Sequence, residues 1–333
     1  SQILPLFKQQ SCLNEKNITE GEFCNSCRKA LFEKRNVRSG LNFDLQQYVD
    51  FLATSKGRFS ISGVQPKIIL MLNGRELEPV TSGGTHILKP SPRSYNIPRY
   101  PDEVPANEHL TMQIASQLFK INTAKNCFIR FKSGESAYLT KRFDRRPDGT
   151  KIAQEDFCQL MNVSEENYGS DYKYKFSYES AASVITRFCS ANVVEMEKFF
   201  SLVLFNYAFS NGDAHLKNFS LTQSVHGDYL LSPAYDLLNT SLHYPDESRT
   251  ALDLFDEIET KQYINNGFYT GACFLKFAEI LKVRQTLALK ALSSYSEKLS
   301  SVETLVRRSM LSSSAKEDYI ARFKDRLKAL GIR

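Results

Sequence analysis

The sequence has no apolar run long enough to cross a membrane. Its most apolar stretch, Phe199–Phe209, is interrupted by Ser201 and Asn206 and falls far short of the ~20 residues that a membrane-spanning helix needs. The N-terminal residues also lack the charged start and long apolar centre of a secretory signal. We therefore expect a cytoplasmic protein without a membrane partner, in which Phe199–Phe209 belongs to a buried helix.

Strong charge of one sign and a regular set of cysteines are absent as well. The chain has 43 Lys and Arg residues against 37 Asp and Glu residues, and the resulting net charge of +6 is too small to argue for nucleic-acid binding. The 7 cysteines are an odd number and are scattered, which argues against a disulfide framework and favours a reducing compartment. Repeats of fixed period and low-complexity tracts are also missing, so the composition indicates a folded globular protein.

The types of residue and their periodicity change along the chain. A polar segment at residues 1–45 contains three of the cysteines, and residues 46–148 then carry short β-branched and aromatic runs separated by Gly, Pro, Asn and Ser. These features predict an N-terminal Cys-containing segment followed by a β-rich lobe. The elements expected in the lobe are helices at 44–56 and 106–119 and strands at 59–72, 85–88 and 137–143.

Residues 149–333 have mainly helical periodicity and predict a second, helical lobe. A hairpin with its turn at Gly227 is expected within it, at residues 218–235. Kinases have the same order of parts, which is a β-rich lobe, then a connector, then a helical lobe with one hairpin. We therefore predict an α+β, two-lobed, protein-kinase-like fold. The helices expected in the second lobe lie at 155–161, 178–191, 196–210, 287–299, 302–311 and 318–330.

The strongest local motif is NGDAHLKN at residues 211–218, directly after the apolar helix. Asp213 precedes Asn218 by five residues, which is the spacing of the kinase catalytic loop. Asp213 can accept the proton of an attacking hydroxyl, and the Asn218 carbonyl oxygen suits Mg²⁺. The expected hairpin returns the chain to Asp236, a second carboxylate that could share the metal with Asn218. The alternative is a polar loop that caps the helix, with Asp236 in a turn.

Two further residues of this motif could assist the chemistry. His215 could pack against Asp213 and orient it. Lys217 could neutralise charge that develops on the transferred phosphoryl group. Each could equally be an ordinary surface side chain.

The first lobe contains neither a GxGxxG nor a Walker A sequence, so other residues must bind phosphate. The segment Ser60–Lys67 offers Gly63, hydroxyls and a lysine between strand-like residues, although Ser and Gly occur in many hairpins. Lys89 ends an apolar strand 26 residues after Gly63, where a kinase keeps the lysine that grips the α- and β-phosphates. Glu108 on the next helix could pair with Lys89. The alternatives are an edge-strand lysine in solvent and a helix-start glutamate favoured by the macrodipole.

The connector between the lobes is a third candidate for nucleotide contact. Lys141 and Phe143 end the last strand of the first lobe, where a kinase presents backbone groups and an aromatic side chain to adenine. The alternative is a solvated linker. The following residues 154–159 indicate an N-cap turn that enters a helix.

The N-terminal cysteines have partial metal-site spacing. Cys24 and Cys27 are three residues apart and Cys12 could be a third thiolate, but no fourth ligand lies nearby. We do not expect zinc there, and we expect the other cysteines to be core residues.

Several motifs together resemble the HipA-like Ser/Thr kinases, the toxins of bacterial toxin–antitoxin modules. SISGVQPK, HILKP, RFDR, QEDFCQ, NGDAHLKNFSL and LSPAYDLLNT occur in this order between about residues 55 and 260. The resemblance implies a catalytic base at Asp213, Mg²⁺ ligands at Asn218 and Asp236, and a phosphate-binding lysine at Lys89. His215 and Lys217 match positions near the γ-phosphate, and ATP and Mg²⁺ are the implied cofactors.

The resemblance also implies how the Gly-rich loop acts. Its residues Ser62, Gly63, Val64, Gln65 and Lys67 would cover the nucleotide, while Lys141 and Phe143 would meet adenine. Ser60 and Ser62 match the position at which family members autophosphorylate, which ejects the loop and silences the enzyme.

The implied partners follow from the same family. Substrates include aminoacyl-tRNA synthetases, phosphorylated on a serine so that translation stops, and a HipB-like antitoxin would mediate any contact with DNA. Full-length HipA proteins carry an extra N-terminal subdomain that this chain lacks. This chain is similar in size to the short HipT kinases, for which a separate HipS-like protein can supply the N-terminal subdomain.

Two other functions fit parts of the pattern. A small-molecule kinase of the aminoglycoside-phosphotransferase type has the same Asp–Asn spacing. A non-catalytic module could instead use nucleotide, or the basic C-terminal helices, to hold an antitoxin or DNA. The complete set of Lys89, Asp213, Asn218 and Asp236 argues against the non-catalytic module.

Overall fold

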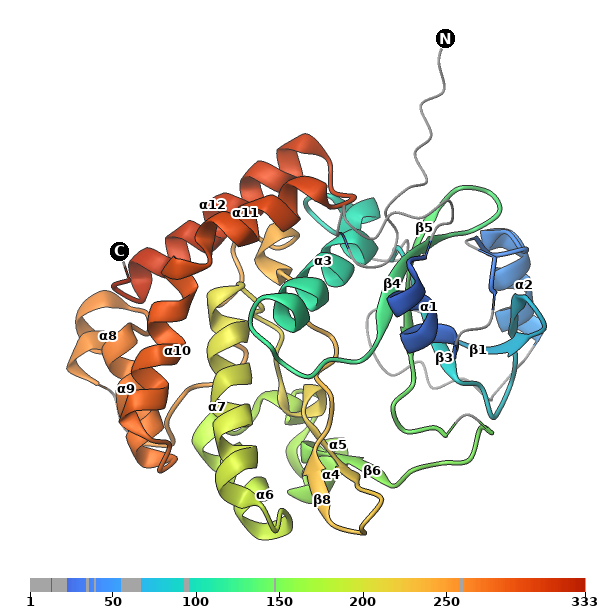
Figure 1. The fold of residues 1–333 in the computed structure, drawn as a ribbon. Coiled ribbons are helices and arrows are strands. Elements are labelled where there is room, and N and C mark those ends of the chain that lie inside the picture. Colours follow the sequence, from blue (N-terminus) through green and yellow to red (C-terminus); the bar gives the residue numbers. More distant parts are fainter. Residues whose placement is uncertain are drawn as a thin grey trace.

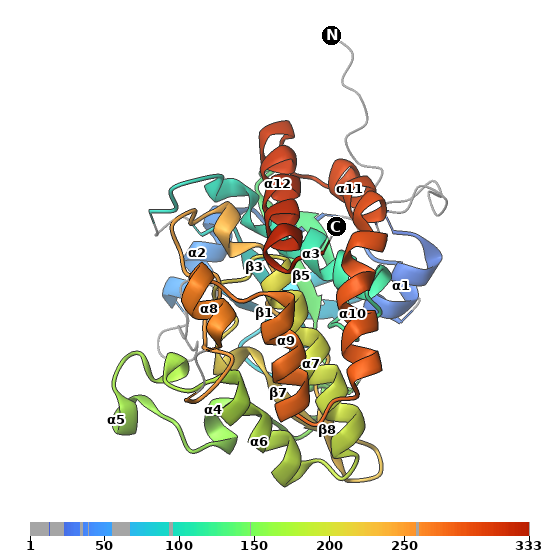
Figure 2. The ribbon, with the colours of Figure 1, turned by 90° about the vertical axis from the view of Figure 1, so that its left-hand side faces the viewer.

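The computed structural model describes residues 13, 23–33, 36–38, 40–54, 67–92, 96–146, 148–257 and 260–332. The chain forms a β-rich lobe and a helical lobe that lie side by side in Figure 1, and in Figure 2 the helical lobe faces the viewer with the strands of the first lobe behind it. Within the described ranges, no helix is both long and apolar enough to span a bilayer.

The first lobe is built on an antiparallel sheet of five strands in the order β2-β1-β3-β5-β4. The first two strands are joined by a two-residue loop in which Gly74 has a φ of +59°, the backbone that a type II′ hairpin needs at this position. The elements of this lobe are α1 (Asn25–Phe32), α2 (Leu45–Thr54), β1 (Ile68–Asn73), β2 (Glu76–Pro79), β3 (His86–Pro90), α3 (Val104–Gln117), β4 (Asn126–Arg130) and β5 (Ser136–Lys141).

One face of this sheet is covered by the N-terminal helices. Leu88 lies opposite Leu139 in the β3–β5 ladder, and both side chains are fully buried. Phe32 of α1 and Tyr48 of α2 belong to the same hydrophobic cluster. Described residues on both sides of the division expected at residue 45 therefore share one core, and the division itself stays a prediction.

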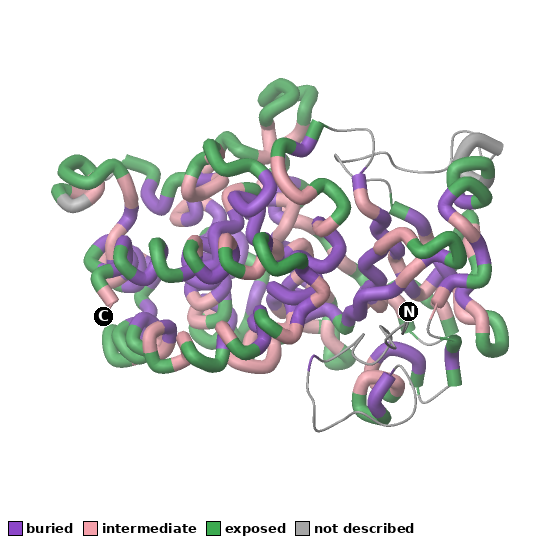
Figure 3. Tube along the Cα trace, turned by 90° about the horizontal axis from the view of Figure 1, so that it is seen from above, coloured by how far each residue is buried: buried purple, intermediate pink, exposed green. Residues whose placement is uncertain are grey.

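The other face of the sheet meets the helical lobe through α3. Because side chains alternate along a strand, Phe128 and Tyr138 point away from α1 and α2. They join the large hydrophobic cluster that continues through α3 and into the helical lobe. The helix α3 is buried along most of its length, including the polar residues Asn107, Glu108 and His109. Figure 3 shows that buried segments run through the inside of the molecule, with exposed segments around them. Polar side chains on this helix therefore face partners inside the protein.

The helical lobe is organised around α7, as the apolar run predicts. Phe205 stacks on Phe209 with ring centroids 4.4 Å apart, and Phe209 stacks in turn on Phe323 of the last helix at 4.6 Å. The elements of this lobe are β6 (Gln154–Asp156), α4 (Phe157–Leu160), α5 (Glu165–Tyr168), α6 (Tyr178–Phe188), α7 (Asn192–Ala208), β7 (Ser220–Gln223), β8 (Tyr229–Leu231), α8 (Lys261–Asn266), α9 (Gly271–Ile280), α10 (Gln285–Glu297), α11 (Leu299–Arg308) and α12 (Ser313–Ala329). Short 3-10 turns are η2 (Pro101–Glu103), η3 (Tyr172–Tyr174), η4 (Leu216–Asn218) and η5 (Thr240–Leu242).

The hairpin predicted within this lobe is confirmed. β7 and β8 pair antiparallel, and Gly227 in the turn has a φ of +90°. β6 pairs with the other edge of β7, an addition that the sequence did not predict. The expected N-cap turn is also present, because Asp156 and Gln159 form a reciprocal capping box at the start of α4. The hairpin brings the residues before β7 and after β8 close together.

Candidate active site

The centre of the candidate site is a buried lysine between two carboxylates. Lys89 at the end of β3 donates from Nζ to Glu108 Oε1 of α3 at 2.6 Å and also to Asp236 Oδ1, which follows β8. The ring of Tyr138 lies beside the ammonium, 5.3 Å from centroid to Nζ. The predicted pairing of Lys89 with Glu108 is thus confirmed, and the residues come from both lobes.

The charges of Lys89 and Asp236 stabilise each other, whereas burial raises the pKa of Glu108 despite the nearby charge of Lys89. Burial disfavours the charged form of Lys89, but the carboxylates of Asp236 and Glu108 outweigh this effect and raise the pKa of the lysine. Burial likewise disfavours the ionised form of Asp236, yet Lys67 and Lys89 outweigh it and hold the pKa of this carboxyl well below its usual range. Lys67 Nζ lies 3.8 Å from Asp236 Oδ2. At neutral pH the site therefore holds a cationic Lys89 and an anionic Asp236.

Asp236 is held in a left-handed backbone conformation with a φ of +55°, which Asp tolerates better than most residues. Asn211 Nδ2 donates to the Asp236 carbonyl at 3.3 Å, and Asn218 Nδ2 donates to Asp236 Oδ2 at 3.2 Å. The two predicted metal ligands, Asn218 and Asp236, are therefore in direct contact, as the hairpin between them requires.

The loop that follows α7 is held by a hydrogen bond to that helix and by close contact with the segment at 247–248. Asn211 Nδ2 donates to Asn206 Oδ1 on the last turn of α7 at 2.8 Å. A Cβ on Gly212 would lie only 2.5 Å from the Ser248 carbonyl oxygen and 2.7 Å from Glu247 Cδ. Only glycine fits there without a shift of the chain, so the segment at 247–248 sets the path of the loop into Asp213.

Asp213 lies at the open side of the loop, with its side chain half exposed. His215 Nε2 is 4.0 Å from Asp213 Oδ1, and the His215 backbone N–H donates to Asn218 Oδ1 at 3.0 Å. Burial lowers the pKa of His215 to about 4, so the ring is neutral at physiological pH. His215 thus lies beside Asp213 as a neutral ring, and its role in orienting that carboxylate stays a prediction.

Lys217 pairs with Asp156, a residue of the N-cap turn that the sequence predicts. Its Nζ lies 3.9 Å from Asp156 Oδ2 and 3.4 Å from the Tyr172 hydroxyl. Burial disfavours the charged lysine, but Asp156 and the hydrogen bond to Tyr172 prevail and raise its pKa. Lys217 is therefore a cation within the loop that carries Asp213, anchored by residues outside that loop.

One side chain that the sequence analysis missed contacts the predicted base directly. Tyr174 in the turn η3 donates its hydroxyl to Asp213 Oδ1. Its surroundings in the sequence, YGSDYKYKFS, contain several tyrosines without a spacing that marks one of them. Only the path of this loop across the helical lobe brings Tyr174 to Asp213.

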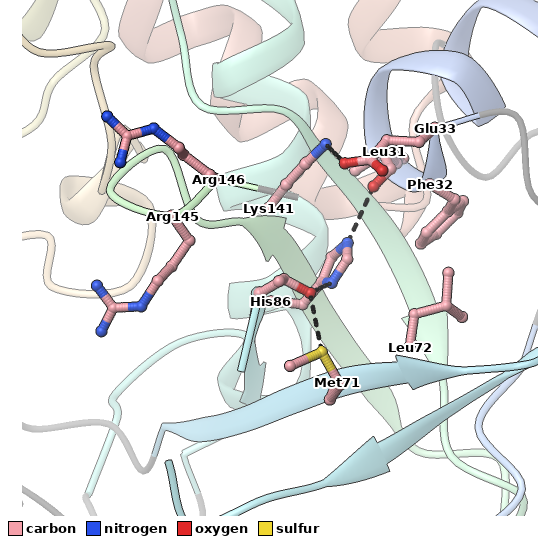
Figure 4. A pocket seen from close by; sticks show the side chains of 10 residues that line it. Leu31, Phe32, Glu33, Met71, Leu72, His86, Lys141, Arg145 and Arg146 are labelled. Carbon is pink, nitrogen blue, oxygen red and sulfur yellow. Dashed lines mark hydrogen bonds and ion pairs between the residues drawn. The ribbon is translucent and has the colours of Figure 1, made fainter. Parts of the chain in front are cut away.

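The two connector residues separate in the structure. The Phe143 ring packs near that of Tyr235, the neighbour of Asp236, with centroids 5.7 Å apart. Lys141 pairs with His86 across the β3–β5 ladder, on the opposite sheet face from Lys89, and its Nζ binds Glu33 Oε1 at 3.0 Å (Figure 4). Strand alternation points the Lys141 side chain into a pocket beneath α1, on the face away from Lys89. The prediction that backbone groups of the connector at Lys141 and Phe143 meet adenine stays a prediction.

Other predicted residues lie outside the part of the chain that the structure describes. These are Ser60, Ser62, Gly63, Val64 and Gln65 of the Gly-rich loop, together with Cys12. Cys24 is described and caps α1, since its Sγ accepts from the Cys27 backbone N–H at 3.4 Å. Among the described residues, no group of three or more His, Cys, Asp or Glu side chains is arranged to hold a metal ion.

Comparisons of the sequence with known proteins agree on one family. The sequence model of the HipA-like C-terminal domain matches residues 59–309. A candidate kinase of Haemophilus influenzae is 27% identical over 277 residues, which cover 79% of this chain and 78% of that protein. The Ser/Thr-protein kinase toxin HipA of Shewanella oneidensis is 30% identical over 221 residues, or 61% of this chain and 48% of the toxin. The chain thus spans about half the length of that relative.

Solved structures show the same fold. A chain in the complex of HipA, HipB and operator DNA from Shewanella oneidensis matches with a TM-score of 0.63 at 24% identity, over 83% of this chain and 66% of that one. The Helicobacter pylori kinase CtkA matches with a TM-score of 0.56 at 13% identity, over 83% of this chain and 92% of its own. The chain belongs to the HipA-like C-terminal domain family and has its two-lobed, kinase-like α+β fold.

Proposed function

We propose that this chain is an ATP- and Mg²⁺-dependent Ser/Thr protein kinase. The observation that carries the proposal is the convergence of Lys89, Asn218 and Asp236 from three separate segments, with Asp213 on the same loop as Asn218. Protein kinases hold ATP with a lysine that is paired to a helix glutamate and with an aspartate that binds Mg²⁺, and Lys89, Glu108 and Asp236 supply these three groups in one place.

The residues present fit ATP and Mg²⁺. Asp236 is ionised and offers the hard carboxylate oxygen that Mg²⁺ prefers. Asn218 lies beside it with Nδ2 on Asp236 and with Oδ1 on the His215 backbone N–H, so its amide would turn to present an oxygen to a metal shared with Asp236. Mg²⁺ in kinases takes few protein ligands because the phosphates and water complete its shell. When bound, the metal neutralises negative charge on the phosphates. Asn218 and Asp236 would hold it, and Lys89 and Lys67 would contribute positive charge to the same region.

Other residues of the site would have separate roles in phosphoryl transfer. Asp213 would accept the proton of the serine hydroxyl as that oxygen attacks the γ-phosphorus and the bond to ADP breaks. Lys217, a cation fixed by Asp156, would stabilise the negative charge of the transferred group. Glu108 would keep Lys89 in place. Most of the rate increase would come from positioning and charge.

The biological role proposed is that of a toxin in a toxin–antitoxin module. Its support is the family membership and the similarity to the Shewanella oneidensis toxin. In this role the kinase would act in the cytoplasm on a serine of an aminoacyl-tRNA synthetase. A HipB-like antitoxin would restrain it, a HipS-like protein could add an N-terminal subdomain, and DNA would be reached only through the antitoxin. Autophosphorylation of Ser60 or Ser62 would regulate the enzyme.

The test is phosphoryl transfer with defined acceptors. Purified protein is incubated with ATP and Mg²⁺ alone, with dephosphorylated casein, and with an aminoglycoside, and each acceptor is analysed by mass spectrometry. A gain of 80 Da on protein serine, about the mass of one phosphoryl group, supports the proposal. Transfer only to the aminoglycoside would identify a small-molecule kinase. ATP binding without any transfer would identify the non-catalytic module.

A further inference from the structure

A single turn outside the catalytic loop contacts both of its charged residues. The turn η3 places the Tyr174 hydroxyl on Asp213 Oδ1 and the Tyr172 hydroxyl 3.4 Å from Lys217 Nζ. Neither tyrosine belongs to a motif that predicts kinase chemistry. The turn nevertheless lies against the segment that carries the proposed base.

Asp213 has one oxygen engaged and one oxygen open. Both nearby groups of the described residues, the Tyr174 hydroxyl and His215 Nε2, approach Oδ1. The side chain is 51% exposed, so packing alone does not fix its orientation. Burial, followed by the bond to Asp213, raises the pKa of Tyr174, which keeps the phenol protonated and makes it a donor at neutral pH.

Tyr174 is itself held in place. Its ring meets that of His215 edge to face, with centroids 5.2 Å apart and an interplanar angle of 81°. The Lys173 ammonium lies 4.9 Å from the Tyr174 ring centroid on the same turn. His215, Tyr174 and Asp213 thus form a connected series in which a buried ring supports the phenol and the phenol supports the carboxylate.

We propose that Tyr174 is a positioning residue for phosphoryl transfer. Its hydroxyl holds Oδ1 of Asp213, so that Oδ2 faces the acceptor and takes the proton of the attacking hydroxyl. The acceptor oxygen forms the new bond to phosphorus, the bond to ADP breaks, and Tyr174 keeps its own proton throughout. This inference rests on the proposed function, because it assigns Tyr174 a role through Asp213.

The experiment compares Tyr174→Phe with Tyr168→Phe. Tyr168 is in the same connecting segment, but its ring packs on Phe176 at 5.4 Å and is not in contact with Asp213 or Lys217 in the described structure. ADP release is measured with dephosphorylated casein as acceptor across pH 5 to 9. Tyr174→Phe is expected to lower kcat about tenfold with an unchanged KM for ATP, whereas Tyr168→Phe keeps both values.

The pH profile provides a readout that a purely structural role would not change. The Tyr174 hydroxyl donates to the proposed base, so its loss should change the shape of the kcat profile across pH, whereas partial unfolding would scale kcat by the same factor at every pH. An unchanged kcat and profile would overturn the inference, and so would a higher kcat, which would mean that Tyr174 obstructs the acceptor. Wild-type protein that releases no ADP would instead overturn the proposed function.

Discussion

Lys89 and Glu108 form an ion pair of 2.6 Å in which only 6% and 2% of the respective side chains are exposed. A buried charge is costly unless it has a partner of opposite charge, so each of these two side chains depends on the other. Lys89 also reaches Asp236 of the other lobe. The first lobe is therefore linked to the proposed metal site through the buried ammonium group of Lys89, with that of Lys67 nearby.

Removal of the Glu108 charge should weaken both the fold and ATP binding. In Glu108→Gln the buried Lys89 keeps Asp236 as its remaining carboxylate, so we expect a loss of about 1–3 kcal/mol in unfolding free energy and a raised KM for ATP. Glu279→Gln is the control, because its pair with Lys276 is exposed and should change stability by less than about 0.5 kcal/mol. Urea unfolding and initial-rate kinetics measure the two effects. Equal behaviour of the two variants would contradict this account.

Gly212→Ala should damage the catalytic loop. The added methyl group would meet the Ser248 carbonyl oxygen at 2.5 Å, and the loop must move before the chain can accept it. We expect at least a tenfold loss of ADP release and a destabilisation of about 1–3 kcal/mol. Gly40→Ala is the matched control, since its new Cβ would have an ordinary 3.6 Å contact with the Arg130 carbonyl oxygen. Wild-type rates in Gly212→Ala would show that the loop tolerates a different path.

Glu247 should make stability depend on pH near neutrality. Burial raises its pKa to about 7, although the Thr240 hydroxyl donates to it. The folded state therefore binds a proton more tightly than the unfolded state, whose Glu has a pKa near 4.3. This contribution to stability is complete below about pH 4.3 and is lost as pH rises through 7.

The comparison of wild type with Glu247→Gln isolates this effect. Between pH 5 and 8 the unfolding free energy of the wild type should fall by roughly 2 kcal/mol relative to the variant, which cannot ionise at this position. Chemical unfolding at several pH values measures the difference. Parallel pH dependences of the two proteins would show that Glu247 does not titrate in this range.

Phosphorylation of the Gly-rich loop should switch the enzyme off. A phosphoserine at residue 60 or 62 adds about −1.5 to −2 charges, which would repel the ATP triphosphate. We expect the double variant Ser60→Ala and Ser62→Ala to stay active for longer, and Ser60→Asp or Ser62→Asp to bind ATP more weakly. Phosphopeptide mapping of active protein identifies the site. Modification found only elsewhere, together with normal ATP binding by the Asp variants, would count against this regulation.

The residues of the candidate site could be singled out from the sequence because kinase chemistry constrains their order and spacing. Asp213, Asn218 and Asp236 sit on a loop and a hairpin whose signals are local, and the structure brings Asn218 and Asp236 into contact. The apolar run predicted α7, and the Gly227 turn predicted the hairpin, since both patterns are complete within a short window.

The remaining features depend on contacts between distant segments. The Lys141 side chain points away from the site because the β3–β5 register places it beside His86, and its partner Glu33 is 108 residues away in the sequence. Tyr174 reaches Asp213 across 39 residues through an irregular loop. The strands β2 and β4 are short, and β6 overlaps a helix cap, so their sequences give weak periodic signals.

The most direct test of the central claim is the intact mass of dephosphorylated protein before and after incubation with ATP and Mg²⁺, with dephosphorylated casein present. Wild type should transfer phosphate to itself or to casein. Asp213→Asn and Asp236→Asn should transfer none, because each change is nearly isosteric and removes the charge needed for proton transfer or metal binding. The unfolding midpoint of Asp213→Asn should stay close to that of wild type, since this side chain is half exposed. Asp236→Asn should lose stability as Glu108→Gln does, since it also removes a carboxylate partner of the buried Lys89. Phosphate transfer by either variant at a rate near that of wild type would contradict the assignment of this site.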